Sequence, residues 1–310
     1  MKRAGRLFQR AALFYIEDVI MRKNEFQPIQ QNGEGRRTGW VVSTHGARIY
    51  VETAGSGPVI LLVHGWTLSG KFWLRQLTGL SDRFQVVTMD LRAHGNSSKT
   101  LEGHTMECCS EDVQAVITAL NLENVVLAGW SLAGPVVLEY WRRFGGGKLS
   151  ALALVEMTPF PFSPEKWNTH ALKGYNFNAM HASFRMLQED RNAFGEKFVH
   201  NMFKGGHAPS EALDWMLTEH LKTPTPAAMA VYSDYIMGDY TEVLKGVSIP
   251  SLAIYGDSNH LCFGPKTGRY VADRIPECRL EVLNRSGHMP FYEQPEEFNS
   301  LLVDLALHRR

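Results

Sequence analysis

The sequence has little of several features that would assign it to a specialised class of protein. Only four of its 310 residues are cysteine, and they form neither a Cys-x-x-Cys pair nor the Cys/His spacing of zinc sites. We therefore expect neither a disulfide-built secreted scaffold nor a structural zinc module, but reduced thiols and a cytoplasmic protein.

The chain also has no excess charge of one sign and no long apolar run. Its 32 Lys and Arg residues balance 32 Asp and Glu residues, so nothing in the overall charge favours nucleic acid or an anionic membrane as a partner. No stretch of about 18 apolar residues predicts a transmembrane helix. Hydrophobic residues make up 44% of the chain, which is typical of a globular protein with a sizeable core.

Residues 1–37 differ from the rest of the chain. Apolar residues recur at helical spacing within residues 1–23 and are flanked by basic ones, which predicts an amphipathic helix. Such a helix could bind a membrane surface, dock on a partner or pack on its own domain. Residues 27–39 are polar, contain glycine and have no period, and are therefore interpreted as a linker.

From residue 38 onward, short apolar runs alternate with helical patterns. This alternation predicts an α/β fold with a mostly parallel, eight-stranded sheet flanked by helices. The expected strands are residues 41–44, 48–53, 59–63, 85–89, 124–128, 151–155, 251–255 and 279–283, and the expected helices are residues 73–80, 110–120, 132–143, 265–274 and 296–308.

One segment interrupts the alternation. Residues 159–238 contain no convincing strand but several amphipathic helical stretches rich in aromatic residues and methionine. Inserted between the two parts of the core, residues 38–158 and 239–310, this segment is expected to form a helical cap over the carboxyl ends of the strands. Open α/β sheets bind ligands at that edge, so an apolar pocket is expected there.

The clearest chemical signal is the stretch Gly-Trp-Ser-Leu-Ala-Gly around Ser131. It follows an apolar strand directly and precedes a helix, so the serine must lie on a tight turn with its hydroxyl exposed. The positions two before and two after must be small, and Gly129 and Ala133 meet that requirement. The pattern predicts a nucleophilic serine.

A serine nucleophile needs a base, and the base needs an orienting acid. In the chain order serine, acid, histidine, the candidates are Asp257 after one predicted strand and His288 after the last. Glu156, at another strand end, is the alternative acid. His260 lies close to Asp257 and is interpreted as a surface or pocket-rim residue.

Attack on a carbonyl also requires two donors for the developing oxyanion. The backbone amide of Leu132 follows the nucleophile directly, and the amide of Trp66 lies in the loop after residues 59–63. His64 in the same loop is expected to fix the loop by hydrogen bonds rather than to act as a second base.

These motifs resemble the α/β-hydrolase superfamily from about Thr38 onward. The resemblance rests on His-Gly-Trp at 64–66, Asp-Leu-Arg-Ala-His-Gly-Asn-Ser at 90–97, the turn around Ser131, Gly-Asp at 256–257 and Gly-His at 287–288. Residues 64–77 (HGWTLSGKFWLRQL), followed by residues 90–97, are similar to the cofactor-free esterase/haloperoxidase (perhydrolase) branch. The resemblance implies a structural role for residues 90–97. In proteins of this superfamily, glycine is commoner at the position of Ala93. The second small residue of the turn around the serine is usually glycine as well, and here it is Ala133.

We therefore expect a serine hydrolase that cleaves small-molecule carboxylic esters with small to medium apolar acyl groups, without metal or cofactor. The expected substrate-binding residues are Trp66, Trp130, Phe160 and Phe162. The alternatives on the same residues are lactone or carbon–carbon bond hydrolysis, perhydrolase or haloperoxidase activity, and a ligand receptor that keeps a hydrolase-like pocket. Oligomeric state and physiological substrate do not follow from the sequence.

Overall fold

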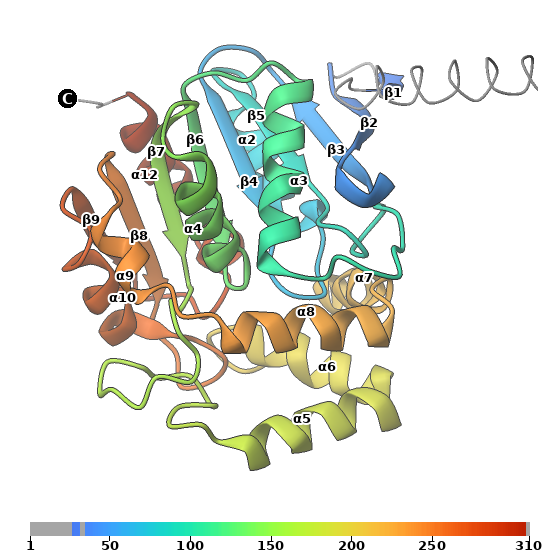
Figure 1. Ribbon diagram of the computed structural model, residues 1–310, viewed down its shortest axis with the longest axis vertical. Helices are drawn as coiled ribbons and strands as arrows, with labels where there is room; N and C mark the ends of the chain where they lie inside the picture. Colours follow the sequence, from blue (N-terminus) through green and yellow to red (C-terminus); the bar gives the residue numbers. More distant parts are fainter. Residues whose placement is uncertain (1–26, 32–34, 308–310) are drawn as a thin grey trace, which may run out of the picture.

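A computed structural model describes residues 27–31 and 35–307 of the chain. Its centre is a nine-stranded sheet with the order β1-β2-β3-β5-β4-β6-β7-β8-β9 (Figure 1). The strands are β1 (Gln27–Gln31), β2 (Arg37–Val42), β3 (Arg48–Ala54), β4 (Val59–Val63), β5 (Gln85–Met89), β6 (Val125–Trp130), β7 (Leu149–Val155), β8 (Ser251–Gly256) and β9 (Cys278–Leu283).

The six strands from β4 to β9 are parallel, as their composition predicts. Strands β4 and β6 are buried along their whole length, because helices cover both faces of the sheet there. Register pairs such as Val63 with Gly129 and Trp130 with Val155 bring the carboxyl ends of β4, β6 and β7 to one edge. The loops that follow these strands therefore meet at a common place.

The first three strands form an antiparallel extension. Strand β2 pairs with β3 through Trp40 and Tyr50, as expected, and β3 pairs with β5. The interpretation of residues 27–39 as a linker is wrong: β1 pairs with β2, which itself begins at Arg37. Backbone hydrogen bonding can extend a sheet edge without the apolar alternation on which the prediction relied. All eight expected strands are present, and β1 is the ninth.

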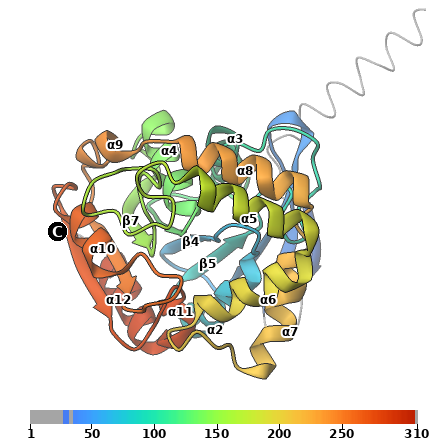
Figure 2. The ribbon, with the colours of Figure 1, turned by 90° about the horizontal axis from the view of Figure 1, so that it is seen from below.

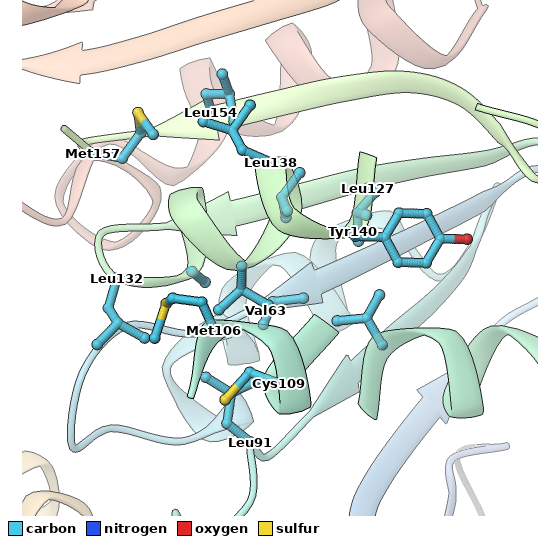
Figure 3. Packing of buried hydrophobic residues seen from close by; sticks show 14 of the residues in the cluster. Val63, Leu91, Met106, Cys109, Leu127, Leu132, Leu138, Tyr140, Leu154 and Met157 are labelled. Carbon is cyan, nitrogen blue, oxygen red and sulfur yellow. The ribbon is translucent and has the colours of Figure 1, made fainter. Parts of the chain in front are cut away.

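Helices cover both faces of the sheet. On one face lie α3 (Met106–Ala119), α4 (Ala133–Phe144) and α10 (Gly264–Ala272), and on the other α2 (Leu74–Leu80) and α12 (Pro295–Leu307). Figure 3 shows part of the hydrophobic core on the first of these faces, where side chains of the sheet pack against α3 and α4. The four remaining short elements of the core are η2 (Thr44–Gly46), η3 (Gly70–Trp73), α9 (Thr241–Lys245) and α11 (Pro290–Glu293).

The segment between β7 and β8 is helical, and within it the structure shows no strand among residues 156–250. It contains α5 (Phe177–Glu189), α6 (Arg191–Met202), α7 (Ser210–Leu221) and α8 (Thr225–Met237). These four helices, called the cap helices below, lie beyond the carboxyl ends of the parallel strands (Figures 1 and 2). They therefore roof the sheet edge at which the loops meet.

Two expectations concern the N-terminal segment and membranes. The amphipathic helix predicted for residues 1–23 lies outside the described residues. Among the helices of residues 35–307, none has the length and apolar character needed to cross a bilayer.

Candidate active site

Ser131 lies on a strained turn between β6 and α4. Its φ of 58° is in the left-handed region, which few residues other than glycine adopt. The turn is held by hydrogen bonds from the Ser131 amide to the Val155 carbonyl and from the Gly134 amide to the Ser131 carbonyl, each 2.9 Å. A side chain at Gly129 would place its Cβ 2.3 Å from the Ala133 carbonyl oxygen, which explains why small residues flank the serine. This is the geometry of a nucleophile elbow.

His288 lies in the loop after β9 and is held from two sides. Its backbone amide donates to the Met202 carbonyl of α6, and its carbonyl accepts from Trp130 Nε1, each at 2.8 Å. The loop packs so tightly that a Cβ on Gly256 would lie 2.0 Å from the Gly287 carbonyl oxygen. The imidazole is 2% exposed and lines the same cavity as Ser131.

The carboxylate that contacts His288 belongs to Glu156. His288 Nδ1 donates to Glu156 Oε2 at 3.0 Å, and both side chains are buried. Glu156 follows β7 directly, and its φ of 42° turns the chain sharply at the strand end. With Nδ1 engaged by the carboxylate, Nε2 is the ring nitrogen available as a base, which is the arrangement that a serine nucleophile requires.

Glu156 is fixed by further donors from the loop after β8. Its Oε1 accepts the Gly256 amide at 2.8 Å, the Gly264 amide at 3.3 Å and the Cys262 thiol at 3.2 Å. Its Oε2 accepts the Phe263 amide at 2.8 Å. A buried carboxylate is tolerated only when its lone pairs are satisfied, and here backbone groups of a separate segment satisfy them.

The expectation that Asp257 orients His288 is contradicted by this geometry. The Asp257 side chain is exposed, and its backbone is the part that contributes to the site. The Asp257 amide donates to the Ser286 carbonyl at 2.8 Å, and its own carbonyl accepts from Lys204 Nζ. Glu156 contacts His288 and accepts the amide of Gly256, whereas the side chain of the next residue, Asp257, is exposed.

The two expected oxyanion donors lie beside the nucleophile. Within the described residues, neither the Trp66 nor the Leu132 amide donates a hydrogen bond. The loop after β4 lies against the elbow, since a Cβ on Gly65 would be 3.1 Å from Ser131 Cβ. Both amides therefore have no competing acceptor among the described residues.

His64 has the structural role expected of it. Its Nδ1 donates to the Gly65 carbonyl at 2.7 Å, and its Nε2 accepts the Leu91 amide at 2.9 Å. Burial lowers its pKa well below the ordinary value, so the ring is neutral. Both nitrogens are used by backbone groups, and the ring ties the loop after β4 to the loop after β5.

The cap helices also hold the loop that carries Trp66. The Trp66 indole donates to the Ala228 carbonyl of α8 at 2.8 Å. Thr67, with a φ of 58°, donates from Oγ1 to the Trp66 carbonyl at 2.6 Å and accepts from His220 Nδ1 of α7 at 2.7 Å. The Trp66 amide itself belongs to the Gly65–Trp66 peptide, and the cap contacts Trp66 through its indole and, by way of Thr67, through the carbonyl of the next peptide.

A cavity of about 510 Å³ lies between the cap helices and these loops. Aromatic side chains form a large part of its walls, which also contain polar residues such as Lys197 and Asn201, and it opens onto Ser131 and His288. The aromatic side chains that line it are Trp66, Phe184, Phe194, Phe198, Tyr232, Tyr235 and Phe263.

The comparisons with known proteins agree with this architecture. The chain matches the Alpha/beta hydrolase family over residues 60–301. It belongs to that family.

Relatives lie in the esterase and haloperoxidase branch. The non-heme haloperoxidase of Rhodococcus erythropolis is 26% identical over 80% of this chain and 92% of its own length. The pimeloyl-[acyl-carrier protein] methyl ester esterase of Nitrosospira multiformis is 25% identical over 83% of this chain and 98% of its own length. An esterase structure from Exiguobacterium antarcticum has the same fold, with a TM-score of 0.79 at 23% identity over 86% of this chain and 98% of that one.

Of the four expected substrate-binding residues of this α/β hydrolase, only Trp66 lines the cavity. Trp130 is fully buried, and its indole N–H donates a hydrogen bond to the His288 carbonyl. Phe162 is buried against Tyr175, and Phe160 packs on the core. The three predictions for Trp130, Phe160 and Phe162 are therefore wrong, because these side chains pack against other parts of the protein and do not line the cavity.

Several cavity residues of the hydrolase were not predicted individually. Tyr232 and Tyr235 are three positions apart on α8 and so share one helical face, a spacing visible in the sequence. His170 and Phe263 come from irregular loops and carry no such signal. His260 is exposed and lines the cavity, as expected of a rim residue.

Residues 90–97 form a structural loop in this hydrolase. Asp90 accepts the Gly70 and Asn96 amides at 2.6 Å each, and burial raises its pKa to about 6. Ala93, with a φ of 62°, adopts the backbone conformation for which glycine is commoner. The loop thus accepts alanine at the cost of a strained backbone.

Proposed function

We propose that this hydrolase cleaves carboxylic esters through Ser131, His288 and Glu156. The observation that carries the proposal is the buried hydrogen bond between His288 Nδ1 and Glu156, with Ser131 in the same cavity. Glu156 thereby takes the role that the sequence suggested for Asp257.

The reaction follows from the roles of these groups. His288 Nε2 removes the proton of Ser131 as the hydroxyl oxygen attacks the ester carbonyl, and Glu156 stabilises the resulting imidazolium. The Trp66 and Leu132 amides bind the oxyanion. His288 then protonates the leaving alcohol, and a water molecule activated by the same base releases the acid and frees Ser131.

The cavity supports an apolar substrate of modest size. A volume of about 510 Å³, with seven Phe, Tyr or Trp side chains in its walls, accommodates a small to medium acyl or alcohol group. The curated relative named as a methyl ester esterase acts on the same class of bond. We therefore place the substrate among small-molecule esters.

The test is hydrolysis of p-nitrophenyl esters from acetyl to decanoyl, with the wild type beside Ser131→Ala. We expect turnover that peaks at one chain length and falls by about 10⁴-fold or more in the variant. Unchanged thermal unfolding would show that the variant folds. Residual turnover above a few per cent of wild type in pure protein would contradict the role of Ser131.

A further inference from the structure

The Tyr235 hydroxyl is a buried polar group in the wall of the cavity. The Tyr235 hydroxyl is buried and, among the described residues, has no hydrogen-bond partner, although the side chain is only 3% exposed. Other buried tyrosines are paired: Tyr255 donates to the Met157 carbonyl at 2.7 Å, and Tyr140 to Gln114 at 2.9 Å. An unpaired buried hydroxyl costs free energy, so its retention requires an explanation.

Tyr235 lines the cavity that also contains Ser131 and His288. It lies on α8, and its ring centroid is 6.4 Å from that of His170, which lines the same cavity. A ligand that accepts a hydrogen bond from Tyr235 inside this cavity is therefore in the same cavity as the nucleophile, Ser131.

His170 offers a second donor beside Tyr235. Its Nδ1 accepts the Leu172 amide at 3.1 Å, so in the neutral ring the hydrogen lies on Nε2. Burial, together with the nearby His288, lowers the pKa of His170 to about 4, and the ring is neutral at pH 7. Within the part of the chain that the structure describes, Nε2 has no partner.

The remaining lining is compatible with a ligand oxygen at this place. Among the described residues, no Asp or Glu side chain lines the cavity, so no carboxylate competes for the two donors. Ring faces surround them, with Phe263 stacked on His170 at 5.6 Å and Tyr232 at 5.7 Å from Tyr235. Two donors in an aromatic wall form a small polar spot that favours a carbonyl oxygen over a methyl group.

We propose that the preferred ester carries a second carbonyl oxygen, as a ketone, which accepts hydrogen bonds from the Tyr235 hydroxyl and His170 Nε2. The proposal rests on the proposed ester hydrolysis and adds the chemical class of its substrate, an oxo ester. The ketone belongs either to the acyl group or to the alcohol, and these two sources are separated experimentally.

The test uses pairs of esters with the same shape. In the acyl arm, p-nitrophenyl 4-oxopentanoate is compared with p-nitrophenyl 4-methylpentanoate, and in the alcohol arm, 3-oxobutyl acetate is compared with 3-methylbutyl acetate. We expect wild-type kcat/KM to favour the oxo ester by about 10-fold in one arm, which is the effect of one net hydrogen bond. Tyr235→Phe should bring that ratio to within about twofold of one.

The matched control is Tyr140→Phe, which removes a tyrosine hydroxyl paired with Gln114 outside the cavity. This variant should keep the wild-type ratio. A wild-type ratio near one in both arms, or a preference that survives Tyr235→Phe, would overturn the proposal.

Binding measurements separate this inference from the proposed function. Calorimetric titration of Ser131→Ala with the two acetates and with ethyl 4-oxopentanoate and ethyl 4-methylpentanoate requires no turnover. Tighter binding of an oxo ester that is lost when Tyr235→Phe is added supports the inference even if no ester is hydrolysed. Equal binding within each pair would refute the inference even if ester hydrolysis is confirmed.

Discussion

The floor of the cavity and its roof use polar groups in different ways. On the floor, the Glu156 carboxylate accepts hydrogen bonds from His288, three backbone amides and a thiol. In the roof, the hydroxyl of Tyr235 lines the cavity and is buried without a partner among the described residues. The Glu156 carboxylate is fully paired without a ligand, whereas the Tyr235 hydroxyl is not.

This difference separates the chemistry from the selection of substrate. Groups fixed by backbone hydrogen bonds keep their geometry before the substrate arrives, which is what proton transfer and oxyanion binding need. The unpaired Tyr235 hydroxyl of the roof can gain a hydrogen bond only when a ligand enters. Changes in the floor should therefore lower kcat for every ester, and changes in the roof should alter the ranking of esters.

Apart from loss of the nucleophile, we expect the largest effect from replacing Glu156, with Asp257 as the control. Glu156→Gln should lower kcat by about 10³-fold or more on all esters, because the amide no longer stabilises the imidazolium of His288. The control Asp257→Asn alters an exposed side chain and should stay within about twofold of wild type. Steady-state kinetics on one ester that the wild type hydrolyses well measures kcat of both variants. Comparable losses of kcat in the two variants would contradict the assignment of the acid to Glu156.

A smaller effect is expected where roof and floor meet. Thr67→Val removes the hydroxyl that joins His220 to the Trp66 carbonyl, so the residue that carries the expected oxyanion amide is held less firmly. We expect kcat to fall by about 10-fold with KM little changed, because the loss is confined to the transition state.

The control for Thr67→Val is Thr78→Val, which removes an exposed hydroxyl that donates to the Leu74 carbonyl at 2.8 Å. It should leave both kinetic constants at their wild-type values. A Thr67→Val variant that raised KM alone would show that Thr67 supports substrate binding instead of the oxyanion.

The smallest effect concerns the stability of the roof as pH changes. Burial lowers the pKa of His220 to about 3, so the unfolded chain binds this proton more readily than the folded one. Folding stability is therefore highest above the unfolded pKa of about 6.5 and falls as pH decreases toward 3. Urea unfolding of wild type and His220→Asn at pH 7, 6, 5 and 4 measures the dependence.

The wild-type free energy of unfolding should fall more steeply than that of His220→Asn, by up to about 1.4 kcal/mol per pH unit. His64 and His94 are also buried with lowered pKa values and contribute to the slope of both proteins. Parallel curves for the two proteins would contradict the neutral state of His220 in the fold.

Much of this architecture could be predicted because its signals are local. The apolar runs of β4 and β5 define those strands at both ends. Glycine is required at position 129 because a Cβ there would lie 2.3 Å from the Ala133 carbonyl oxygen. The choice of acid is different. Asp257 and Glu156 both follow parallel strands, and only the loop that delivers the amides of Gly256 and Phe263 decides which carboxylate is buried.

Other features could not be predicted because they depend on tertiary contacts. Strand β1 is held by edge pairing in a polar sequence, and Trp130 turns toward His288 instead of the cavity. Tyr235 appears in the sequence as one more aromatic residue of an amphipathic helix. Its lack of a partner becomes visible only when its neighbours are in place.

The most direct test of the central claim is proton NMR of protein labelled with ¹⁵N-histidine, observed at the Nδ1 hydrogen of His288. A hydrogen bond to a buried carboxylate shifts this proton far downfield and protects it from exchange with water. The resonance should be present in wild type and in Asp257→Asn and absent in Glu156→Gln. Its loss in Asp257→Asn, with retention in Glu156→Gln, would contradict the account and return the role of the acid to Asp257.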